Sequence, residues 1–353
     1  MFFIQGMTRL NHLNHVSVVS VIIPCRNEEN FIGKCLDSII ANDYPKDKLE
    51  VLVIDGMSED GTRAVLKQYT GLYPFIRVLD NHKKITPSAL NVGVKNAKGE
   101  IIIRKDAHST YEKDYISKCV RYLREYDADN VGGIWITVPR NDSLMAKAIV
   151  FSLSHPFGVG NAHYRIGRQT EPRLVDTVPF GCFRKDVFDR IGLFDEAYPR
   201  NEDIEFNTRL RKAGGKILLV PGIVVHYYAR STFRAFCIHN FDNGLKVIDL
   251  LKFDRRLVSW RHLTPLVFTF SLVASAVLSL FSTAFLLAFM ALYGFYMFVN
   301  LWFSIEIMFR EKNIRFLFLM PLTFSVLHLT YGLGSIWGIA KKVGRAGPRL
   351  HNL

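Results

Sequence analysis

The chain has 353 residues, a formal net charge of +13 at neutral pH and a mean hydropathy of +0.12. That length is enough for one large domain or two ordinary ones. A chain that is both strongly basic and apolar on average must keep its apolar and charged residues in different regions. Residues 263–305 are 43 consecutive positions without Asp, Glu, Lys or Arg. This excludes a purely soluble protein.

The distribution of net charge along the chain also indicates which kinds of partner the protein binds. Residues 263–340 carry a net +1 and residues 341–353 a net +4, so +8 remains on residues 1–262. Such a balance is typical of proteins that bind nucleic acid, an anionic membrane face or a phosphorylated ligand. The sequence has neither an RNP motif nor a zinc-finger spacing. We therefore expect membrane lipids and a phosphorylated ligand as partners, and no nucleic acid.

The cysteines and the N-terminus indicate the compartment. The five cysteines are scattered and form no CxxC pair, which favours a reduced cytoplasmic domain over a disulfide framework or a zinc site. The first 15 residues contain too short an apolar run for a signal peptide. We expect the polar part of the chain to stay in the cytoplasm.

From residue 16 the chain alternates between β-branched runs and amphipathic segments. The pattern predicts strands at 16–25, 49–55, 75–79 and 100–104, and helices at 28–41, 60–73 and 87–97. Strands and helices that alternate with short links predict a doubly wound, mostly parallel α/β sheet. In such sheets ligands bind beyond the carboxyl ends of the strands.

The pattern is less regular further along the chain. It predicts a helix at 113–127, a strand at 130–138, a long loop-rich stretch at 139–178, helices at 186–191 and 202–213, and strands within 216–228 that are broken at Pro221-Gly222. We find no internal repeat and no low-complexity tract.

The C-terminal third is predicted to meet a membrane. Residues 230–262 carry seven Lys or Arg against three Asp with apolar side chains between them, the composition of a helix on a membrane surface. An ordinary amphipathic helix packed on the domain is the alternative. Apolar segments follow at roughly 263–281, 284–305 and 316–340. Three crossings would put the basic tail outside, against the positive-inside rule. A re-entrant or interfacial hairpin at 316–340 would instead leave the basic tail on the cytoplasmic side, and both arrangements stay open.

Two polar motifs follow the first two predicted strands. In Pro24-Cys25-Arg26-Asn27-Glu28 the proline fixes the turn and leaves Glu28 able to bond a planar ligand or a ribose. The alternative is a polar helix start in which Glu28 serves the helix dipole. Asp55 stands between its strand and Gly56, where its carboxylate can accept a hydrogen bond from a base N–H. The alternative for this loop is a turn that caps the next helix.

Two acidic motifs are candidates for catalysis. Asp106 and His108 lie two apart in an extended segment, so both side chains can face one Mn²⁺ or Mg²⁺ ion. The neighbouring Arg104 and Lys105 can serve a diphosphate. The pair Glu202-Asp203 opens a predicted helix, where carboxylates favour the positive end of the dipole. One of the two can instead act as a general base.

Taken in order, these motifs resemble a known family. PCRNEE, VIDGMSEDGT, DAH, FGCFRKDVFDRIGLFDE and NEDIEFNTRLRKAGG are similar to the motifs of family 2 inverting glycosyltransferases with the GT-A fold, over roughly residues 16–230. The apolar segments that follow resemble the membrane-anchored exopolysaccharide branch, of the succinoglycan ExoA type, in which DAH stands in place of DxD. The resemblance implies a Rossmann-like GT-A catalytic domain followed by C-terminal transmembrane helices.

The resemblance also implies how the donor is held. Pro24, Arg26 and Glu28 would line the nucleotide pocket, and Asp55 would bind the base, most often uracil. Arg230 would contact the diphosphate.

The resemblance assigns the remaining residues to metal binding and catalysis. Asp106 and His108 would hold the metal and the diphosphate, and His226 would be a third metal ligand, with a satisfied strand histidine as its alternative. Asp203 would be the catalytic base, and Glu202 would orient the acceptor.

Together these expectations describe a metal-dependent hexosyltransferase of the inner, cytoplasmic membrane. The predicted domains are a cytoplasmic transferase domain at 1–229, an interfacial segment at 230–262 and a multi-pass membrane domain at 263–353. The expected reaction moves one sugar from a nucleotide sugar, a UDP-sugar, to a polyprenyl-linked saccharide in exopolysaccharide or cell-surface glycan synthesis. The Q-x-x-R-W motif of processive synthases is missing, which favours single-sugar transfer. The alternatives are a polyprenyl-phosphate sugar synthase and a non-catalytic membrane scaffold with a transferase fold.

Overall fold

The computed structural model describes residues 16–167, 170–250 and 260–345. The first 15 residues, in which no signal peptide is predicted, part of the predicted interfacial segment and the end of the basic tail lie outside the described residues. The chain divides into two compact units. The first unit comprises Met1–Ile134 and Gln169–Val225, and the second comprises Trp135–Arg168 and His226–Leu353.

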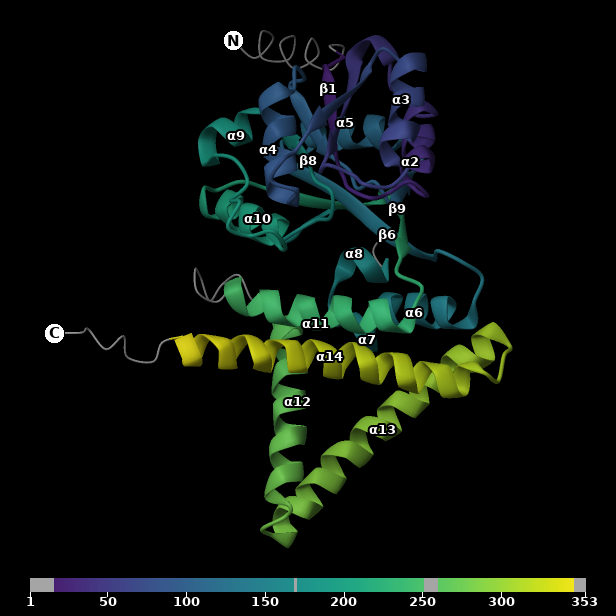
Figure 1. Ribbon diagram of the computed structural model, residues 1–353, viewed down its shortest axis with the longest axis vertical. Helices are drawn as coiled ribbons and strands as arrows, with labels where there is room; N and C mark the ends of the chain where they lie inside the picture. The colour runs from purple at the N-terminus through teal and green to yellow at the C-terminus, as the bar shows by residue number, and fades with distance from the viewer. Residues whose placement is uncertain (1–15, 168–169, 251–259, 346–353) are drawn as a thin grey trace, which may run out of the picture. The chain divides into compact units, whose positions relative to one another are not determined.

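The first unit is built on a nine-stranded sheet (Figure 1), and β6 and β9 continue past its boundary into the second unit. The strand order is β3-β2-β1-β4-β8-β6-β9-β5, and β7 pairs with β9. The strands are β1 Val19–Cys25, β2 Leu49–Asp55, β3 Ile76–Asp80, β4 Ile101–Arg104, β5 Ser109–Tyr111, β6 Asn130–Pro139, β7 Arg173–Leu174, β8 Cys182–Arg184 and β9 Ile217–Ala229.

Strands β1 to β4 form a parallel half-sheet. β1 pairs with β2 from Val19 opposite Leu49 to Cys25 opposite Asp55, and it pairs with β4 on its other side. β3 pairs in parallel with β2. Long runs of Val and Ile are typical of parallel strands covered on both faces, and nearly all side chains of β1, β2 and β4 are buried. The carboxyl ends of these strands therefore share one edge.

The other half of the sheet is mixed. β8 is antiparallel to β4 and to β6, and β7 is antiparallel to β9. The predicted Rossmann-like sheet is thus confirmed, with its parallel part confined to β1–β4. The predicted break at Pro221 is wrong, because β9 runs unbroken through it. A proline fits there because the neighbours β5 and β7 span only three and two residues, so part of β9 needs no ladder donor on that side.

The helices of the first unit lie close to their predicted positions. They are α2 Ile32–Ile40, α3 Thr62–Leu72, α4 Thr86–Asn96, α5 Tyr115–Glu125, α9 Asp186–Ile191 and α10 Glu202–Lys212, with a short 3₁₀ turn η1 at Lys46–Lys48. The largest difference is at α2, which begins four residues later than predicted. The reason is that the amides of Glu28 and Glu29 donate to Thr62 and Asp60 on the next loop instead of starting a helix.

The second unit is helical apart from the strand ends it contains. Its helices are α6 Leu144–Ser154, α7 Pro156–Val159, α8 His163–Ile166, α11 Phe233–Leu250, α12 Trp260–Leu278, α13 Thr283–Glu311 and α14 Phe316–Arg345. The expectation of a loop-rich 139–178 is wrong, since α6, α7 and α8 all lie there. The helix α6 shows no amphipathic period because it is apolar nearly all round and packs Ala148 and Ile149 against Met320, Phe324 and Leu327 of α14.

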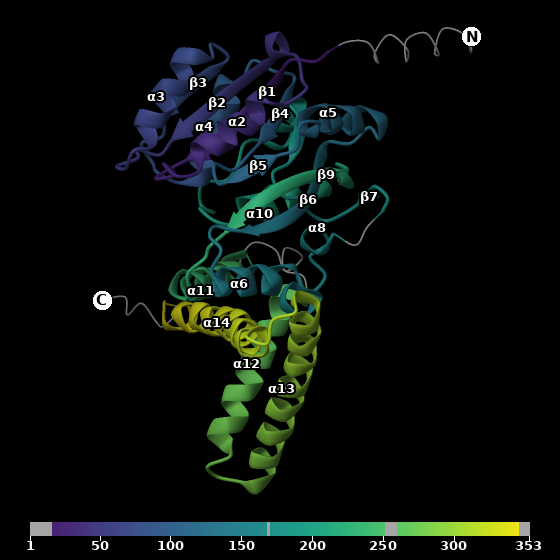
Figure 2. The same ribbon diagram turned by 90° about the vertical axis from the view of Figure 1, so that its right-hand side faces the viewer.

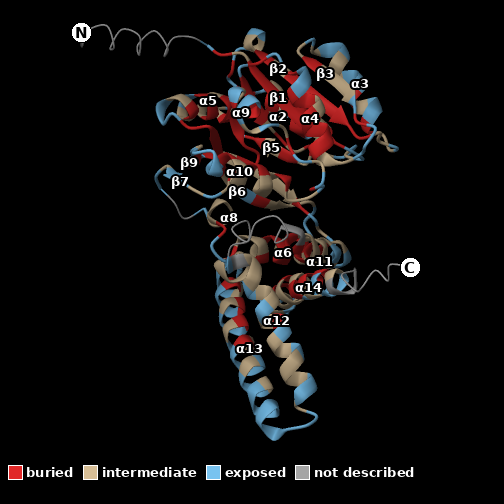
Figure 3. Ribbon diagram, turned by 90° about the vertical axis from the view of Figure 1, so that its left-hand side faces the viewer, coloured by how far each residue is buried: buried red, intermediate tan, exposed pale blue. Residues whose placement is uncertain are grey.

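The apolar helices of the second unit differ in direction. Figures 1 and 2 show α12 and α13 as a hairpin, with α14 running across it beside α11. By length and composition, Thr283–Glu311 and Phe316–Lys342 can each cross a membrane, whereas the apolar stretch His262–Leu278 of α12 is shorter. In Figure 3 the α12–α13 hairpin is largely exposed, in contrast to the buried strands of the sheet. Large apolar side chains such as Phe281, Phe295 and Phe298 lie on that exposed surface.

Candidate active site

The loops that follow β1 and β2 are tied together by hydrogen bonds. The Asn27 amide donates to Ser58 Oγ at 2.9 Å, and the Glu59 amide donates to Asn27 Oδ1 at 2.9 Å. Asn27 adopts a left-handed conformation with φ 54°, which asparagine tolerates better than most residues. These two loops therefore form one fixed rim at the edge where the parallel strands end. Asn27 and Ser58 lie inside the predicted motifs, but sequence reasoning assigned them no role.

Asp55 is fully buried at the end of β2, and its carboxylate already has protein partners. It accepts hydrogen bonds from the amide and the hydroxyl of Ser58, at 3.1 and 2.5 Å, and it pairs with Arg63 Nε at 2.6 Å. Arg63 also reaches Asp80 at the end of β3, at 2.5 Å. Sequence reasoning missed Arg63. The available signal was its place in the first turn of the helix that follows Asp55.

Glu28 and His108 meet across the ends of β1 and β4. His108 Nδ1 lies 3.1 Å from Glu28 Oε1, and their side chains are 23% and 19% exposed. Asp106 is the first residue of the DAH motif, and its backbone amide donates a hydrogen bond to the Tyr111 hydroxyl at 2.9 Å. The backbone of the DAH motif is thereby fixed, while the Asp106 carboxylate stays partly exposed.

Arg104 joins the end of β4 to the start of α10. Its Nη2 atom lies 2.7 Å from Glu202 Oε1 and 3.8 Å from Asp106 Oδ1. Burial lowers the pKa of Arg104, but the carboxylates of Glu202, Asp106 and Asp203 outweigh it and raise that pKa. Burial raises the pKa of Glu202 to about 7 against the pull of Arg104, and Asp203 adds to the rise. The structure thus gathers Asp106, Glu202 and Asp203 around one buried cation.

The two carboxylates at the start of α10 have different environments. The buried face of α10 presents Glu202, Phe206 and Leu210 at helical spacing, and Phe206 stacks on Phe194 with 4.4 Å between ring centroids. This packing turns Glu202 inward onto Arg104. Asp203 is half-buried and accepts a hydrogen bond from the Ile204 amide at 2.9 Å. Asp203 is therefore the more accessible carboxylate of the pair.

Arg104 and Lys105 do not present their charges to solvent at this edge. Lys105 is fully buried, and its Nζ lies 3.1 Å from the ring centroid of Tyr111 and 3.9 Å from that of Tyr115. Burial lowers the pKa of Lys105 to about 7. The expectation that these two residues serve a diphosphate is corrected, because both side chains point into the protein.

The remaining predicted residues are spread over the two units. Pro24 is half-buried on β1, and Arg26 is exposed with its guanidinium 3.8 Å from Glu59. His226, on β9, and Arg230, just after β9, belong to the second unit. Their roles stay predictions.

The side chains at the strand edge are compatible with a divalent ion whose coordination is completed by the substrate. Within the described ranges, no three His, Cys, Asp or Glu side chains are grouped so as to hold a metal. Asp106 and His108 nevertheless offer a partly exposed carboxylate and imidazole beside Glu28. Mg²⁺ is commonly held by one or two carboxylates together with substrate phosphates and water. These residues therefore fit an ion that takes its other ligands from a diphosphate.

Comparison with known proteins gives a family for this arrangement. The sequence profile of "Glycosyl transferase family 2" matches residues 20–192. This range begins in β1 and ends just after α9, so it includes the Asp55 and DAH motifs and stops before the Glu202-Asp203 pair.

Two curated relatives each match 60% or more of this chain. The dolichyl N-acetyl-alpha-D-glucosaminyl phosphate 3-beta-D-2,3-diacetamido-2,3-dideoxy-beta-D-glucuronosyltransferase of Methanococcus voltae is 31% identical over 237 residues, which are 65% of this chain and 72% of that one. The succinoglycan biosynthesis protein ExoA of Rhizobium meliloti is 31% identical over 213 residues, 60% of this chain and 63% of that one. The match thus spans less than two thirds of ExoA.

Solved structures share the fold at low sequence identity. The mannosyltransferase PcManGT from Pyrobaculum calidifontis, in complex with GDP-Man and Mn²⁺, has a TM-score of 0.63 at 17% identity and covers 96% of this chain and 95% of its own. GalNAc-T7 with UDP, GalNAc and Mn²⁺ has a TM-score of 0.51 at 18% identity and covers 62% of this chain and 45% of its own. Both show the fold alone.

Proposed function

This chain belongs to glycosyl transferase family 2 and is a glycosyltransferase, and we propose that it moves a single sugar from a nucleotide sugar to a polyprenyl-linked saccharide with inversion at the anomeric carbon. The observation that carries this proposal is the position of Arg104, which pairs with Glu202 and lies 3.8 Å from Asp106. The proposed diphosphate edge and the proposed catalytic base therefore lie side by side.

The nucleotide would bind along the rim that the loops after β1 and β2 form. Pro24, Arg26 and Glu28 are the proposed lining on the β1 side, and Asp55 is the proposed partner of the base. Ser58 and Arg63 hold the Asp55 carboxylate in place before the ligand arrives. We propose a UDP-sugar as the donor. PcManGT holds GDP-Man, so GDP-sugars belong in the same test.

The diphosphate and a Mn²⁺ or Mg²⁺ ion would be held by Asp106 and His108. When bound, such an ion offsets the charge that develops on the leaving diphosphate. Both structural neighbours were solved with Mn²⁺, which supports this choice. On the protein side, the ring of His108 is oriented by Glu28 at 3.1 Å.

Asp203 is the proposed general base. It would take the proton of the acceptor hydroxyl while that oxygen forms a bond to the anomeric carbon and the bond from this carbon to the diphosphate oxygen breaks on the opposite face. Glu202 was expected to orient the acceptor. Because its carboxylate is buried against Arg104, we propose that it does so as a positioning residue, by fixing the first turn of α10.

The acceptor is proposed to be lipid-linked and presented at the cytoplasmic face of the inner membrane. The name of the Methanococcus relative specifies a dolichyl phosphate sugar, and ExoA is named for succinoglycan synthesis. The apolar helices α13 and α14 support a membrane location. A multi-pass arrangement, with the catalytic unit in the cytoplasm, is part of the proposal.

The test is nucleotide release from a panel of UDP- and GDP-sugars by the full chain in detergent, with Mn²⁺ or Mg²⁺. We expect one donor to be turned over when a polyprenyl-linked saccharide is present, and Asp203→Asn to lower turnover roughly 10²- to 10⁴-fold. Glu205→Gln is the matched control, because Glu205 lies on the same helix and pairs with Arg209 at 2.8 Å.

Two further acceptors and a binding measurement separate the alternatives. Turnover with bare polyprenyl phosphate in place of the saccharide would identify a polyprenyl-phosphate sugar synthase instead. Transfer only to water-soluble glycans would overturn the lipid-linked acceptor. If the wild type turns over no donor, calorimetry with the nucleotide sugars decides whether the chain is a scaffold that binds none.

A further inference from the structure

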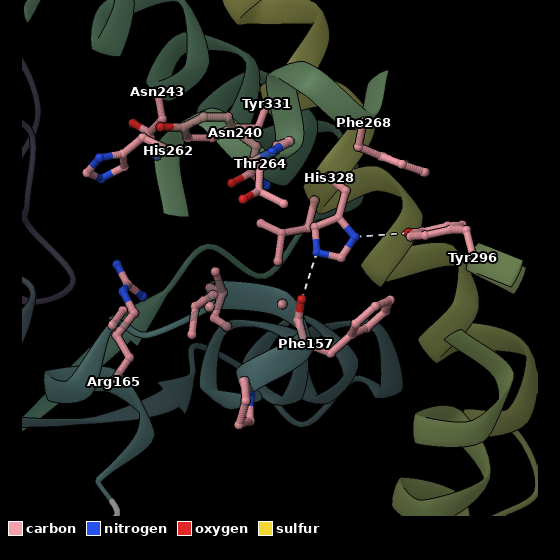
Figure 4. A pocket seen from close by; sticks show the side chains of 18 of the residues that line it. Phe157, Arg165, Asn240, Asn243, His262, Thr264, Phe268, Tyr296, His328 and Tyr331 are labelled. Atoms are coloured by element: carbon pink, nitrogen blue, oxygen red, sulfur yellow. Dashed lines mark hydrogen bonds between the residues drawn. The ribbon is translucent and has the colours of Figure 1, made fainter. Parts of the chain in front are cut away.

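The second unit contains a pocket of about 500 Å³ that lies entirely within that unit. Its walls come from the segment 153–165 and from helices α11, α12, α13 and α14 (Figure 4). The volume is in the range of small-molecule sites, about 300–1,000 Å³. None of the motifs discussed above lines it.

One side of the pocket is polar and carries positive charge. Arg165, Asn240, Asn243, His262 and Thr264 line this side, and the described lining includes no Asp or Glu. Figure 4 shows the Arg165 guanidinium extending toward the side that His262 and Asn243 line. A concave site with amide and guanidinium donors and no carboxylate is complementary to an anion.

Arg165 is held in place by aromatic rings and has a donor to spare. Its guanidinium carbon lies 4.6 Å from the ring centroid of Trp135 and 5.6 Å from that of Tyr164. Trp135 in turn stacks on Tyr227, with centroids 4.6 Å apart and planes at 10°. The Nη1 atom is buried and has no hydrogen-bond partner in the part of the chain that the structure describes. A buried donor without a partner is costly, and a bound oxyanion would satisfy it.

The other side of the pocket is apolar and rigid. Phe157, Phe268 and Leu327 line it. His328 bridges this wall, with Nε2 2.9 Å from the Phe157 carbonyl oxygen and Nδ1 3.0 Å from the Tyr296 hydroxyl (Figure 4). The carbonyl can only accept, so Nε2 carries the proton and Nδ1 accepts from the tyrosine. Three helices are thereby fixed to one another at this point.

We infer that this pocket binds the phosphate-bearing end of an isoprenoid lipid, with the phosphate at Arg165 and the first isoprene units against the apolar wall. The inference rests on the proposed function, because it assigns a place to the lipid carrier of the proposed acceptor. A free nucleotide or an inorganic anion would leave the apolar wall without a partner. A lipid satisfies both sides of the pocket.

The surroundings suit the rest of a long isoprenoid chain. The pocket is too small for such a lipid as a whole. On either side of Phe268 in the sequence, the same helix α12 exposes Val267 and Phe270, which are 58% and 61% exposed. The isoprenoid chain beyond its first units would therefore lie along the apolar surface of this helix.

The test is direct binding of geranylgeranyl diphosphate to the full chain in detergent, measured by calorimetry without any nucleotide sugar. We expect Arg165→Ala to raise the Kd at least tenfold and Arg165→Lys to raise it less, since lysine keeps the charge and loses the two-pronged contact. Arg310→Ala is the control, because Arg310 lies on α13 outside the pocket. The Kd of the Arg310→Ala variant should stay within twofold of the wild-type value.

Two competitors identify which part of the ligand is recognised. Geranylgeraniol, which lacks the diphosphate, and inorganic diphosphate, which lacks the lipid, should each compete at least tenfold more weakly than the complete molecule. If inorganic diphosphate competes equally well, the site is an anion site and the inference is overturned. If phosphatidylglycerol competes equally well, the site is one for ordinary membrane lipid, and the inference is overturned as well.

A second measurement uses only the wild-type protein, so it does not depend on whether a variant folds. A diazirine on the first isoprene unit of the same probe should label wild-type peptides from 153–165, α12 or α14, the three segments that carry the apolar wall. Labelling confined to other segments would contradict the inference. Neither measurement involves the sugar donor, so a chain that binds the lipid but turns over no donor would contradict the proposed function and leave this inference standing.

Discussion

Arg104 and Glu202 form a buried ion pair, with 2.7 Å between Nη2 and Oε1 and side chains that are 11% and 7% exposed. The pair links the last residue of a parallel strand to the first residue of a helix that follows much later in the chain. It also sets the distance between the DAH motif and the Glu202-Asp203 pair. Its geometry is therefore a requirement for the proposed catalysis.

Removing one member of this pair should destabilise the protein strongly. Arg104→Met leaves the Glu202 carboxylate buried without its cation, and the loss of one partner of a buried pair typically costs about 3–5 kcal/mol. We expect a lower thermal unfolding midpoint in detergent, followed by near-ultraviolet circular dichroism. The double variant Arg104→Met/Glu202→Leu should recover most of the stability without recovering sugar transfer. A single variant as stable as the wild type would show that the pair contributes little.

Glu28 should tune metal use through His108. Glu28→Gln keeps the size of the side chain but removes the charge that faces Nδ1 at 3.1 Å. Loss of such a partner typically weakens metal affinity about 10- to 100-fold. The measurement is nucleotide release against Mn²⁺ concentration, in which the half-maximal concentration should rise while turnover at saturating Mn²⁺ changes little.

The control for this measurement is Glu125→Gln, an exposed carboxylate at the end of α5. It changes the net charge by the same amount. If both variants shift the Mn²⁺ dependence equally, the effect comes from overall charge and Glu28 has no special relation to the metal.

Lys105 should make stability depend on pH. Burial lowers its pKa from 10.5 to about 7, so between these values the unfolded chain binds more protons than the folded one. Stability therefore rises with pH in this window, by up to about 1.4 kcal/mol per pH unit. In thermal unfolding with EDTA between pH 7 and 8.5, the midpoint of the wild type should rise more steeply than that of Lys105→Met. The exposed Lys113→Met should keep the steep slope, and equal slopes in all three proteins would refute the prediction.

The parallel half of the fold could be predicted because its signals are local. The run LEVLVID predicts a strand at 49–55, and β2 has the same bounds. Buried parallel strands are continuous apolar runs whose ends are marked by polar residues. The candidate residues after β1, β2 and β4 follow from the same pattern, since parallel strands end at one edge.

What escaped prediction depends on contacts between distant segments. The helix α6 is apolar nearly all round and packs on α14, and no period in its own sequence marks it as a helix. Arg104 and Lys105 were expected to face a diphosphate, as basic residues at a strand end often do. Their inward direction is set by Glu202 and by Tyr111, partners that only the folded chain brings to them.

Glycines should control how closely α11 and α14 approach. A Cβ on Gly334 of α14 would overlap the Phe241 carbonyl oxygen of α11, and a Cβ on Gly244 of α11 would overlap the Tyr331 carbonyl oxygen of α14. Gly334→Ala must therefore push the two helices apart, and overpacking of this kind costs about 1–3 kcal/mol. We expect a lower unfolding midpoint in detergent. Gly294→Ala on α13, where nothing lies within 4 Å of the added carbon, should be neutral or stabilising by up to about 1 kcal/mol through helix propensity.

The same substitution connects this packing to the lipid pocket. Asn240 and Asn243 of α11 and Tyr331 of α14 line the pocket from the two helices that Gly334 holds together. Separating the helices should move these side chains apart, so Gly334→Ala should also raise the Kd for geranylgeranyl diphosphate, whereas Gly294→Ala should not. If Gly334→Ala lowers the unfolding midpoint while leaving this Kd unchanged, the pocket does not depend on the close approach of α11 and α14. If the two glycine variants have the same midpoint, the close packing itself is not needed for stability.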